Sequence, residues 1–177
     1  PRVTMADPWF REPAFVAALA GRIGAALGRL PAEDRSAAQV LLTAHSLPRR
    51  VADGEPGYLE QLEATATAVA NAAGLQPERW TFCWQSAGHE PGEWMKPDFA
   101  DLMPAIGRAR TRAVVVAPIQ FLADHLEVLY DIDVGAREQA EANGVRFERI
   151  GSLNDDAGLI EALAAIARRD GGTPIRP

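Results

Sequence analysis

The chain contains 177 residues, of which 47% are hydrophobic and 24% are charged, and this composition is that of an ordinary globular protein. Its formal net charge of −6 disfavours a general nucleic-acid-binding protein, because such proteins need a basic face to neutralise phosphates. The single cysteine, Cys83, excludes an internal disulfide bond and a cysteine-clustered zinc or iron–sulfur site, and no prosthetic group is indicated. We interpret Cys83 as a buried structural thiol.

The sequence contains no recognisable membrane helix or secretion signal. No apolar run reaches the roughly 18–20 residues that span a bilayer, and no signal peptide is visible. We therefore expect a cytoplasmic protein without a transmembrane segment. The sequence begins Pro-Arg-Val without an initiator methionine, which we interpret as the mark of a piece excised from a longer chain.

The first elements are predicted from apolar spacing. After an irregular lead-in over residues 1–13, apolar residues near helical spacing predict an amphipathic helix over residues 14–30. A turn at residues 31–36 follows. The apolar run over residues 39–44 is too short for a helix and predicts a buried strand, which Pro48 prevents from continuing.

The middle of the chain repeats this alternation. Residues 58–73 predict a second helix, and the aromatic run over residues 80–85 predicts a second strand. A long loop over residues 87–97 precedes a third helix. Asp98 is the expected cap of that helix, and Asp101, three positions later, resembles the second member of a capping box.

The last third is predicted in the same way. Residues 112–117 predict a third strand and residues 124–143 a fourth helix. Residues 145–150 predict a short fourth strand, and residues 155–169 predict the last helix. The tail over residues 170–177 is expected to be frayed.

Regular alternation of strands and helices predicts one α/β domain over residues 1–177, with about four parallel strands and helices on both faces. Right-handed crossovers bring the carboxyl ends of the first three strands to one rim. We therefore expect His45, Gln85, Ser86 and residues 118–127 at a common edge, where open parallel sheets bind ligands.

Three residues at this edge are the main candidates for chemistry. His45 follows a buried strand directly, and a histidine there can accept a proton or bind a metal near neutral pH, although it can also be a loop residue bonded to the backbone. Glu127 could form a capping box with Asp124, which would explain both residues without a catalytic role. That explanation leaves out Asp131, one turn further along the same face, so the two carboxylates could pass protons or hydrated cations.

Other candidates are weaker. His125 lies about 200° around a helix from Glu127 and is expected to have a supporting role. His89 is expected to be an exposed loop histidine, and Trp94 is expected to pack the same loop. Ser46 has no G-x-S-x-G context and no nucleotide-binding glycine motif occurs, so serine hydrolysis and nucleotide binding lose support.

Three stretches in order resemble the ferrochelatases of haem biosynthesis. Residues 42–48, Leu-Thr-Ala-His-Ser-Leu-Pro, resemble the strand and active-site histidine of that family. The pair Gln85-Ser86, with Trp94 after it, resembles its glutamine–serine segment and tryptophan loop. Residues 118–133, from Pro-Ile-Gln-Phe to Asp-Ile-Asp, resemble its longest signature, and the likeness covers nearly the whole chain.

The resemblance implies two similar α/β domains that hold a porphyrin between them, of which this chain is the second and the N-terminal half is absent. It implies that His45 and Glu127 form the pair at the metal-insertion site, with Asp131 in a row of acids along a partly π-type helix. By the same resemblance, the weaker candidates for substrate binding are Ser46, Gln85, Ser86 and Trp94. The chain departs from the family at Gln120, where glycine is usual, and at Gly135, which removes the outermost acid.

The expected function is insertion of Fe²⁺, a substrate and not a resident metal, into coproporphyrin III or protoporphyrin IX. His45 would accept protons and Glu127 would guide the metal opposite it. Two alternatives stay open at this point: a chelatase of the cobalt or sirohydrochlorin type, and a non-catalytic porphyrin-binding domain. A chain that lacks one wall of the cleft is expected to have little activity alone.

Overall fold

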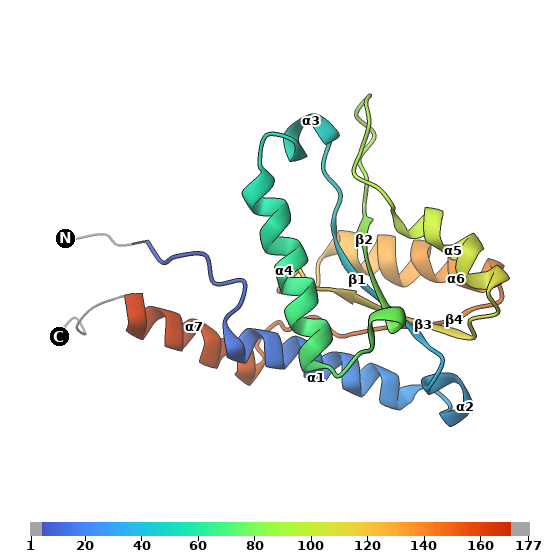
Figure 1. Cartoon of the computed structure of the whole chain (residues 1–177), viewed down its shortest axis with the longest axis horizontal. Helices are drawn as coiled ribbons and strands as arrows, with labels where there is room; N and C mark the ends of the chain where they lie inside the picture. The colour runs from blue at the N-terminus through green and yellow to red at the C-terminus, as the bar shows by residue number, and fades with distance from the viewer. Residues whose placement is uncertain (1–4, 171–177) are drawn as a thin grey trace.

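The computed structural model describes residues 5–170 and shows a four-stranded parallel sheet at the centre of the chain (Figure 1). The strand order is β2-β1-β3-β4, and every neighbouring pair is parallel. The strands are β1 (Gln39–His45), β2 (Trp80–Gln85), β3 (Ala113–Pro118) and β4 (Arg146–Arg149).

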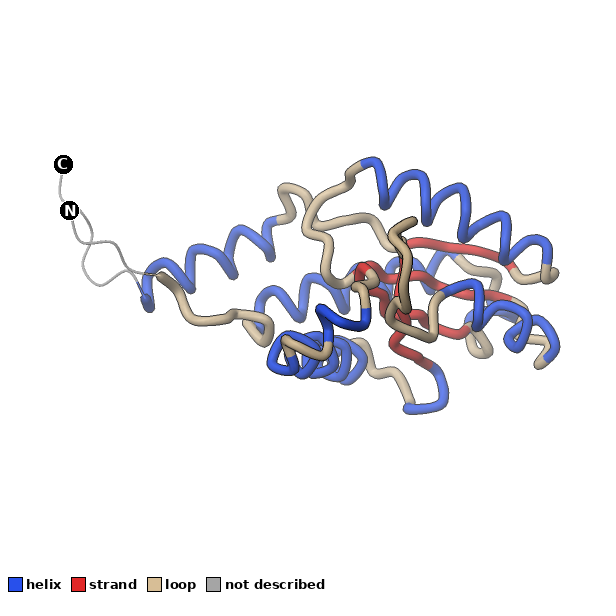
Figure 2. Tube along the Cα trace, turned by 90° about the horizontal axis from the view of Figure 1, so that it is seen from above, coloured by secondary structure: helices blue, strands red, loops and turns tan. Residues whose placement is uncertain are grey.

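Helices cover both faces of the sheet, as Figure 2 shows, and the α/β prediction is confirmed. The helices α1 and α4 pack on one face with α7 against α1, and α5, η2 and α6 pack on the other. Their bounds are α1 (Pro13–Arg29), α2 (Ala32–Arg35), α3 (Arg49–Ala52), α4 (Pro56–Ala72), η1 (Pro77–Arg79), α5 (Phe99–Arg108), η2 (Val128–Ala136), α6 (Arg137–Ala142) and α7 (Ala157–Asp170).

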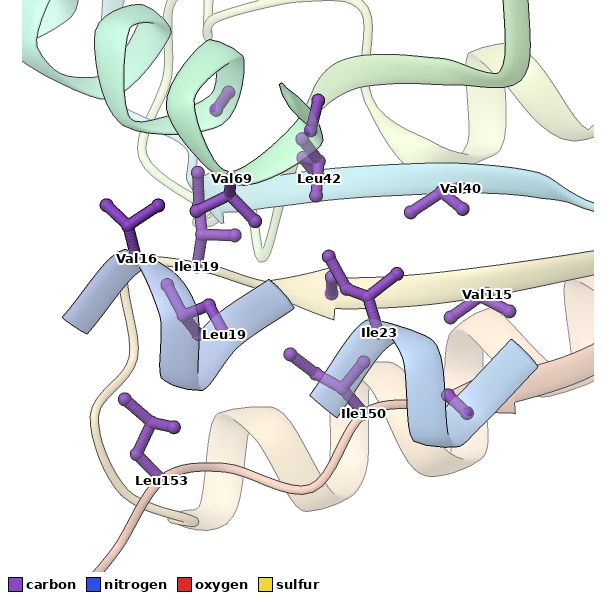
Figure 3. Close-up of a cluster of buried hydrophobic side chains, with 14 of the residues drawn as sticks. Val16, Leu19, Ile23, Val40, Leu42, Val69, Val115, Ile119, Ile150 and Leu153 are labelled. Carbon is purple, nitrogen blue, oxygen red and sulfur yellow. The ribbon is translucent and has the colours of Figure 1, made fainter. Parts of the chain in front are cut away.

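The larger hydrophobic core lies between the sheet and α1, α4 and α7 (Figure 3). Ile23 of α1 and Val115 of β3 belong to this core, as do Leu42 of β1 and Val69 of α4, which lie side by side, and all four side chains are 0% exposed. A strand buried on both faces needs apolar residues at consecutive positions, which is why the short runs in β1 and β3 are almost uninterrupted.

A second core lies on the opposite face. Met103 of α5 and Ile132 of η2 pack against Leu41 and Val116. Cys83 belongs to this core, as expected, and burial together with the nearby charge of Asp98 raises the pKa of its thiol to about 12. The thiol therefore stays protonated and acts as a small apolar side chain.

The capping box at α5 is confirmed. The Asp98 carboxylate accepts a hydrogen bond from the Asp101 amide at 2.9 Å, and the Asp101 carboxylate accepts one from the Asp98 amide at 2.8 Å. Both orphan amides at this helix start are satisfied by a short sequence signal alone.

Two short helices differ from the sequence prediction. The predicted turn at 31–36 contains the single helical turn of α2, and α3 was not predicted. Periodicity cannot identify four-residue helices, because they contain barely one turn. The predicted frayed tail lies outside the described residues from position 171 onwards.

No helix within residues 5–170 has the length and apolar character needed to cross a bilayer.

Replacing Leu42 with alanine should lower the free energy of unfolding by about 2–5 kcal/mol, because a cavity would open at the middle of the central strand. Chemical denaturation checks this. The control is Leu126→Ala, since that side chain is 79% exposed and should change stability by less than about 0.5 kcal/mol. Equal losses in the two variants would contradict the assigned core.

Candidate functional site

His45 is the last residue of β1 and lies at the carboxyl edge of the sheet, opposite Gln85 in the register of β2. Its Nδ1 lies 2.6 Å from the carbonyl oxygen of Ser46. A carbonyl can only accept a hydrogen bond, so we assign the proton of the neutral ring to Nδ1. Nε2 is then the unprotonated nitrogen, free to accept a proton or bind a cation.

Glu127 faces that free nitrogen. Its Oε2 lies 3.5 Å from His45 Nε2, and the two side chains are 50% and 30% exposed respectively. A lone pair and a carboxylate oxygen oppose each other at this distance, so the arrangement favours a proton or a cation between them. With metal–ligand bonds of about 2.1 Å, a divalent cation would bind both atoms at an angle of about 110°.

The helix that follows Glu127 is a π-helix, η2, over nine residues. Its hydrogen bonds run from i to i+5, so its turns are wider than those of an α-helix. Glu127, directly before η2, and Asp131 within it are four positions apart and both line a cavity of about 500 Å³. The partly π-type helix implied by the family resemblance is present.

The cavity lies between η2 and the segment that follows β2. Gln85, Ser86 and the exposed His89 contribute from that segment, and Tyr130 and Gln139 contribute from the helical side. His45 does not line the cavity, so Glu127 is the group that joins the cavity to the histidine.

Gly135 lines the same cavity and contributes no side chain there. The acidic row along η2 therefore consists of Glu127 and Asp131, and the next cavity-lining residue in this direction after Ala136 is Gln139. Across the part of the chain that the structure describes, no three His, Cys, Asp or Glu side chains converge to hold a metal ion. The histidine–glutamate pair could supply two ligands to a metal ion.

The remaining candidate residues occupy different places. Gln85 is buried and accepts a hydrogen bond from the Thr43 hydroxyl, while Ser86 adopts a left-handed backbone with φ of 57° beside the cavity. Ser46 is fully buried, and its hydroxyl donates to the carbonyl of Met95 at 3.2 Å. Ser46 therefore contacts His45 through its carbonyl and lies beneath the surface.

Trp94 packs the loop after β2, as the loop interpretation expects. A Cβ at Gly88 would lie 2.7 Å from the Trp94 ring, so the ring packs directly on the glycine backbone. The indole N–H donates to the Glu90 carbonyl at 3.2 Å. The loop is joined to the segment after His45 where the Met95 amide donates to Leu47.

His125 makes an edge contact with Phe121, whose ring also approaches His45. The centroid distances are 4.5 Å and 6.3 Å. Phe121 thus separates the two imidazoles, which agrees with the supporting role expected for His125. Phe121 itself was missed, because an aromatic residue in a loop carries no distinctive sequence signal.

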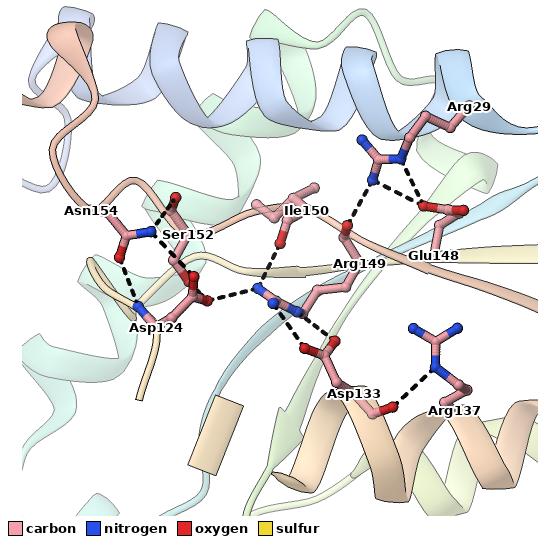
Figure 4. Close-up of polar contacts among 9 residues, drawn as sticks. All are labelled: Arg29, Asp124, Asp133, Arg137, Glu148, Arg149, Ile150, Ser152 and Asn154. Atoms are coloured by element: carbon pink, nitrogen blue, oxygen red, sulfur yellow. Dashed lines mark hydrogen bonds and ion pairs between the residues drawn. The ribbon is translucent and has the colours of Figure 1, made fainter. Parts of the chain in front are cut away.

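The capping box that was the structural alternative for Asp124 and Glu127 does not form. Asp124 accepts hydrogen bonds from the Ser152 hydroxyl at 2.8 Å, from Arg149 at 3.1 Å and from Asn154 at 3.2 Å (Figure 4). Its carboxylate is directed at the end of β4, so it is not available to the amides of the following helix. Asp124 therefore bonds to residues distant in the sequence and not to the backbone of its own helix start.

Arg149 anchors the π-helix to the sheet (Figure 4). Its guanidinium binds both oxygens of Asp133 at 2.7 Å and 2.9 Å and also reaches Asp124. These two carboxylates flank Glu127 in the chain, and Arg149 is only 12% exposed. A bidentate ion pair of this kind fixes orientation as well as distance, and it sets where Glu127 can lie.

The fold lowers the pKa of Asp124 below its ordinary value of 3.8. Burial acts in the opposite direction, but the hydrogen bonds from Asn154 and Ser152 and the charge of Arg149 outweigh it. Asp124 therefore stabilises the fold above its unfolded pKa, and this contribution is lost as the pH falls through the lower folded pKa.

The parallel sheet and the His–Glu pair at its carboxyl edge define a Rossmann-like domain of the chelatase type. A family model described as Ferrochelatase matches residues 1–170, and the chain belongs to the ferrochelatase family.

Curated relatives agree with this assignment. The chain is 37% identical over 164 residues to the ferrochelatase of Deinococcus radiodurans, covering 92% of this chain and 52% of the relative. It is 36% identical to the coproporphyrin III ferrochelatase of Geobacillus kaustophilus, covering 94% and 52%. The corresponding protein of Mycobacterium leprae is 37% identical, with coverage of 94% and 50%. The chain thus spans about half the length of these relatives.

Arg149→Gln should lower the free energy of unfolding at neutral pH by about 1–3 kcal/mol, because two partly buried carboxylates lose their shared partner. The loss of stability as the pH falls below the ordinary aspartate pKa of 3.8 should also become smaller than in the unchanged chain, since Asp124 loses a charge that lowers its pKa. Urea denaturation at several pH values measures both effects.

The control is Arg29→Gln. Arg29 is 51% exposed and pairs with Glu148 at 2.9 Å, so its loss should cost less than about 1 kcal/mol. An Arg149 variant as stable as this control would contradict the anchoring role.

Proposed function

We propose that this chain provides the metal-inserting half of a ferrochelatase, which places Fe²⁺ in a porphyrin during haem biosynthesis. The observation that carries the proposal is the pairing of His45 Nε2 with Glu127 Oε2 at 3.5 Å, with Nδ1 held by the Ser46 carbonyl. Family membership and the names of the relatives give independent support.

The reaction exchanges one cation for two protons. The porphyrin loses the protons of two pyrrole nitrogens and Fe²⁺ binds all four nitrogens. The two released protons carry away the two positive charges that the metal brings, so the metalloporphyrin core stays neutral. The unprotonated Nε2 of His45 accepts a pyrrole proton, and the solvent-exposed edge of the pair passes protons to water. No electron transfer is required.

Glu127 and Asp131 attract the cation. Two carboxylates on one side of η2 give the cavity a negative wall, and oxygen ligands can replace water around Fe²⁺ one at a time. Because Glu127 borders both the cavity and His45, it is the group that passes the metal from one to the other. Because Gly135 has no side chain, this route contains two carboxylates, those of Glu127 and Asp131.

The macrocycle is expected to approach both catalytic groups from the same side. An aromatic ring placed between two atoms needs about 7 Å, twice a carbon contact distance, and the two side chains are 3.5 Å apart. The porphyrin therefore cannot lie between His45 and Glu127, and we propose that it binds at one edge of the pair. Coproporphyrin III is the favoured substrate, since several relatives carry that name, with protoporphyrin IX as the second choice.

We further propose that a preceding half-domain forms the other wall of the porphyrin cleft, as the relatives of twice this length imply. A cytoplasmic location and the absence of a nucleic-acid partner remain predictions. A chelatase acting on cobalt and a different tetrapyrrole can be separated from this proposal by metal competition with a defined porphyrin.

His45→Ala in the complete two-half protein should reduce iron insertion by at least about 100-fold, because the proton acceptor is lost. Porphyrin binding, followed by absorbance or fluorescence titration, should be retained. Glu127→Gln should also lower the rate, with a weaker response to Fe²⁺ concentration.

The matched control is Glu138→Gln, an equivalent change at an exposed position of α6. If His45→Ala lost porphyrin binding and iron insertion equally, a non-catalytic porphyrin-binding role would be favoured over catalysis.

The 177-residue chain alone should insert Fe²⁺ at least roughly 100-fold more slowly than the two-half protein, since a single wall cannot hold the macrocycle in a reactive orientation. Anaerobic assays of both proteins with one porphyrin measure the ratio. Comparable rates would refute the need for a second half.

A further inference from the structure

The side chain of Gln120 connects His45 to α4, one of the helices that cover the sheet. Its Oε1 accepts a hydrogen bond from the backbone amide of His45 at 2.8 Å. Its Nε2 donates to the hydroxyl of Tyr58 in α4. One amide group therefore links the end of β1 to α4, which packs on the same face of the sheet as α1.

Gln120 lies just beyond the point where the hydrogen-bonded pairing of β1 with β3 ends. The pairing of β1 with β3 ends at Thr43 and Pro118, and the last main-chain bond runs from the Ile119 amide to the Thr43 carbonyl at 3.0 Å. The His45 amide comes next and finds its acceptor in a side chain, Gln120. A buried amide without an acceptor costs free energy, so the glutamine carbonyl replaces a missing rung of the ladder.

His45 is held from two directions as a result. On the β2 side, the Ser46 amide donates to the Gln85 carbonyl at 2.7 Å. On the β3 side, Gln120 holds the His45 amide. Fixing the backbone on both sides keeps the Ser46 carbonyl within 2.6 Å of Nδ1, which is the contact that leaves Nε2 unprotonated.

The Tyr58 hydroxyl holds the side-chain amide of Gln120 in place. Burial raises the pKa of its phenol, and the hydrogen bond from Gln120 acts in the opposite direction with less effect. The phenol stays neutral, and its oxygen accepts from the amide nitrogen of Gln120. This contact orients the amide so that its carbonyl, and not its nitrogen, faces His45.

We propose that Gln120 is a positioning residue that, with Tyr58, fixes the tautomer and orientation of the His45 imidazole. The proposal rests on the proton-accepting role proposed for His45. Gln120 does not contact the reacting atoms. A glycine at this position could not supply the acceptor, and Gln120 has no positive φ that would call for one.

The first test reads the imidazole directly. The chain contains three histidines, so long-range ¹H–¹⁵N spectra of ¹⁵N-histidine-labelled chain resolve each ring, with assignment by single substitutions. The unchanged chain should show His45 mainly as the Nδ1–H tautomer. Gln120→Leu and Gln120→Gly should both populate the Nε2–H tautomer, and Tyr58→Phe should do so to a smaller extent.

The control is Gln39→Leu. Gln39 lies at the other end of β1, where its side-chain amide donates to the Thr81 hydroxyl at 3.3 Å, so the change removes a comparable hydrogen bond from the same strand. It should leave the His45 tautomer unaltered. An unchanged tautomer in both Gln120 variants, or an equal change in Gln39→Leu, would overturn the proposal.

The second test measures catalysis in the complete two-half protein. Gln120→Leu should lower kcat by about 10- to 100-fold with little change in the KM for porphyrin, as loss of a supporting residue does. A higher KM at constant kcat would overturn the positioning role. If the unchanged protein shows the Nδ1–H tautomer but inserts no iron, the proposed function fails while the effect of Gln120 on His45 stands.

Discussion

The pairing of β1 with neighbours on both sides is the constraint on which the rest of the structure depends. Because β2, β1 and β3 are parallel, their carboxyl ends meet at one edge, and His45 emerges there beside Gln85 and the segment after Pro118. The strands can occupy the centre only because both of their faces are apolar. A polar residue is tolerated where the ladder ends, and this is where the candidate chemistry lies.

The candidate site also needs a carboxylate facing His45. Arg149 positions the segment that carries this carboxylate, Glu127. By binding Asp124 and Asp133 together, this arginine holds the loop before the π-helix and the helix itself against the end of β4. Glu127 lies between the two anchored carboxylates in sequence. Glu127, at the start of the π-helix, and Asp131, within it, line the same cavity. The two ion-paired carboxylates, Asp124 and Asp133, thus flank the two candidate acids along one segment.

The two groups proposed to accept the proton and to attract the metal have different surroundings. His45 is linked by hydrogen bonds to the sheet and, through Gln120, to α4, so its ring has little freedom. Glu127 is half exposed and borders both the cavity and the histidine. A held imidazole beside a solvent-accessible carboxylate would suit the proposed reaction, in which a hydrated cation must exchange its ligands stepwise.

The sequence by itself determined the layers, the parallel sheet, the edge that carries His45, and the Asp98–Asp101 cap, because apolar periodicity and helix capping act over a few residues. The family resemblance located Glu127 and Asp131. Only the tertiary structure decided that Asp124 binds Arg149 and not the following helix, and that Gln120 completes the bonding of His45. These contacts join residues 25 and 75 positions apart, and such pairings depend on how the layers pack, which no local pattern records.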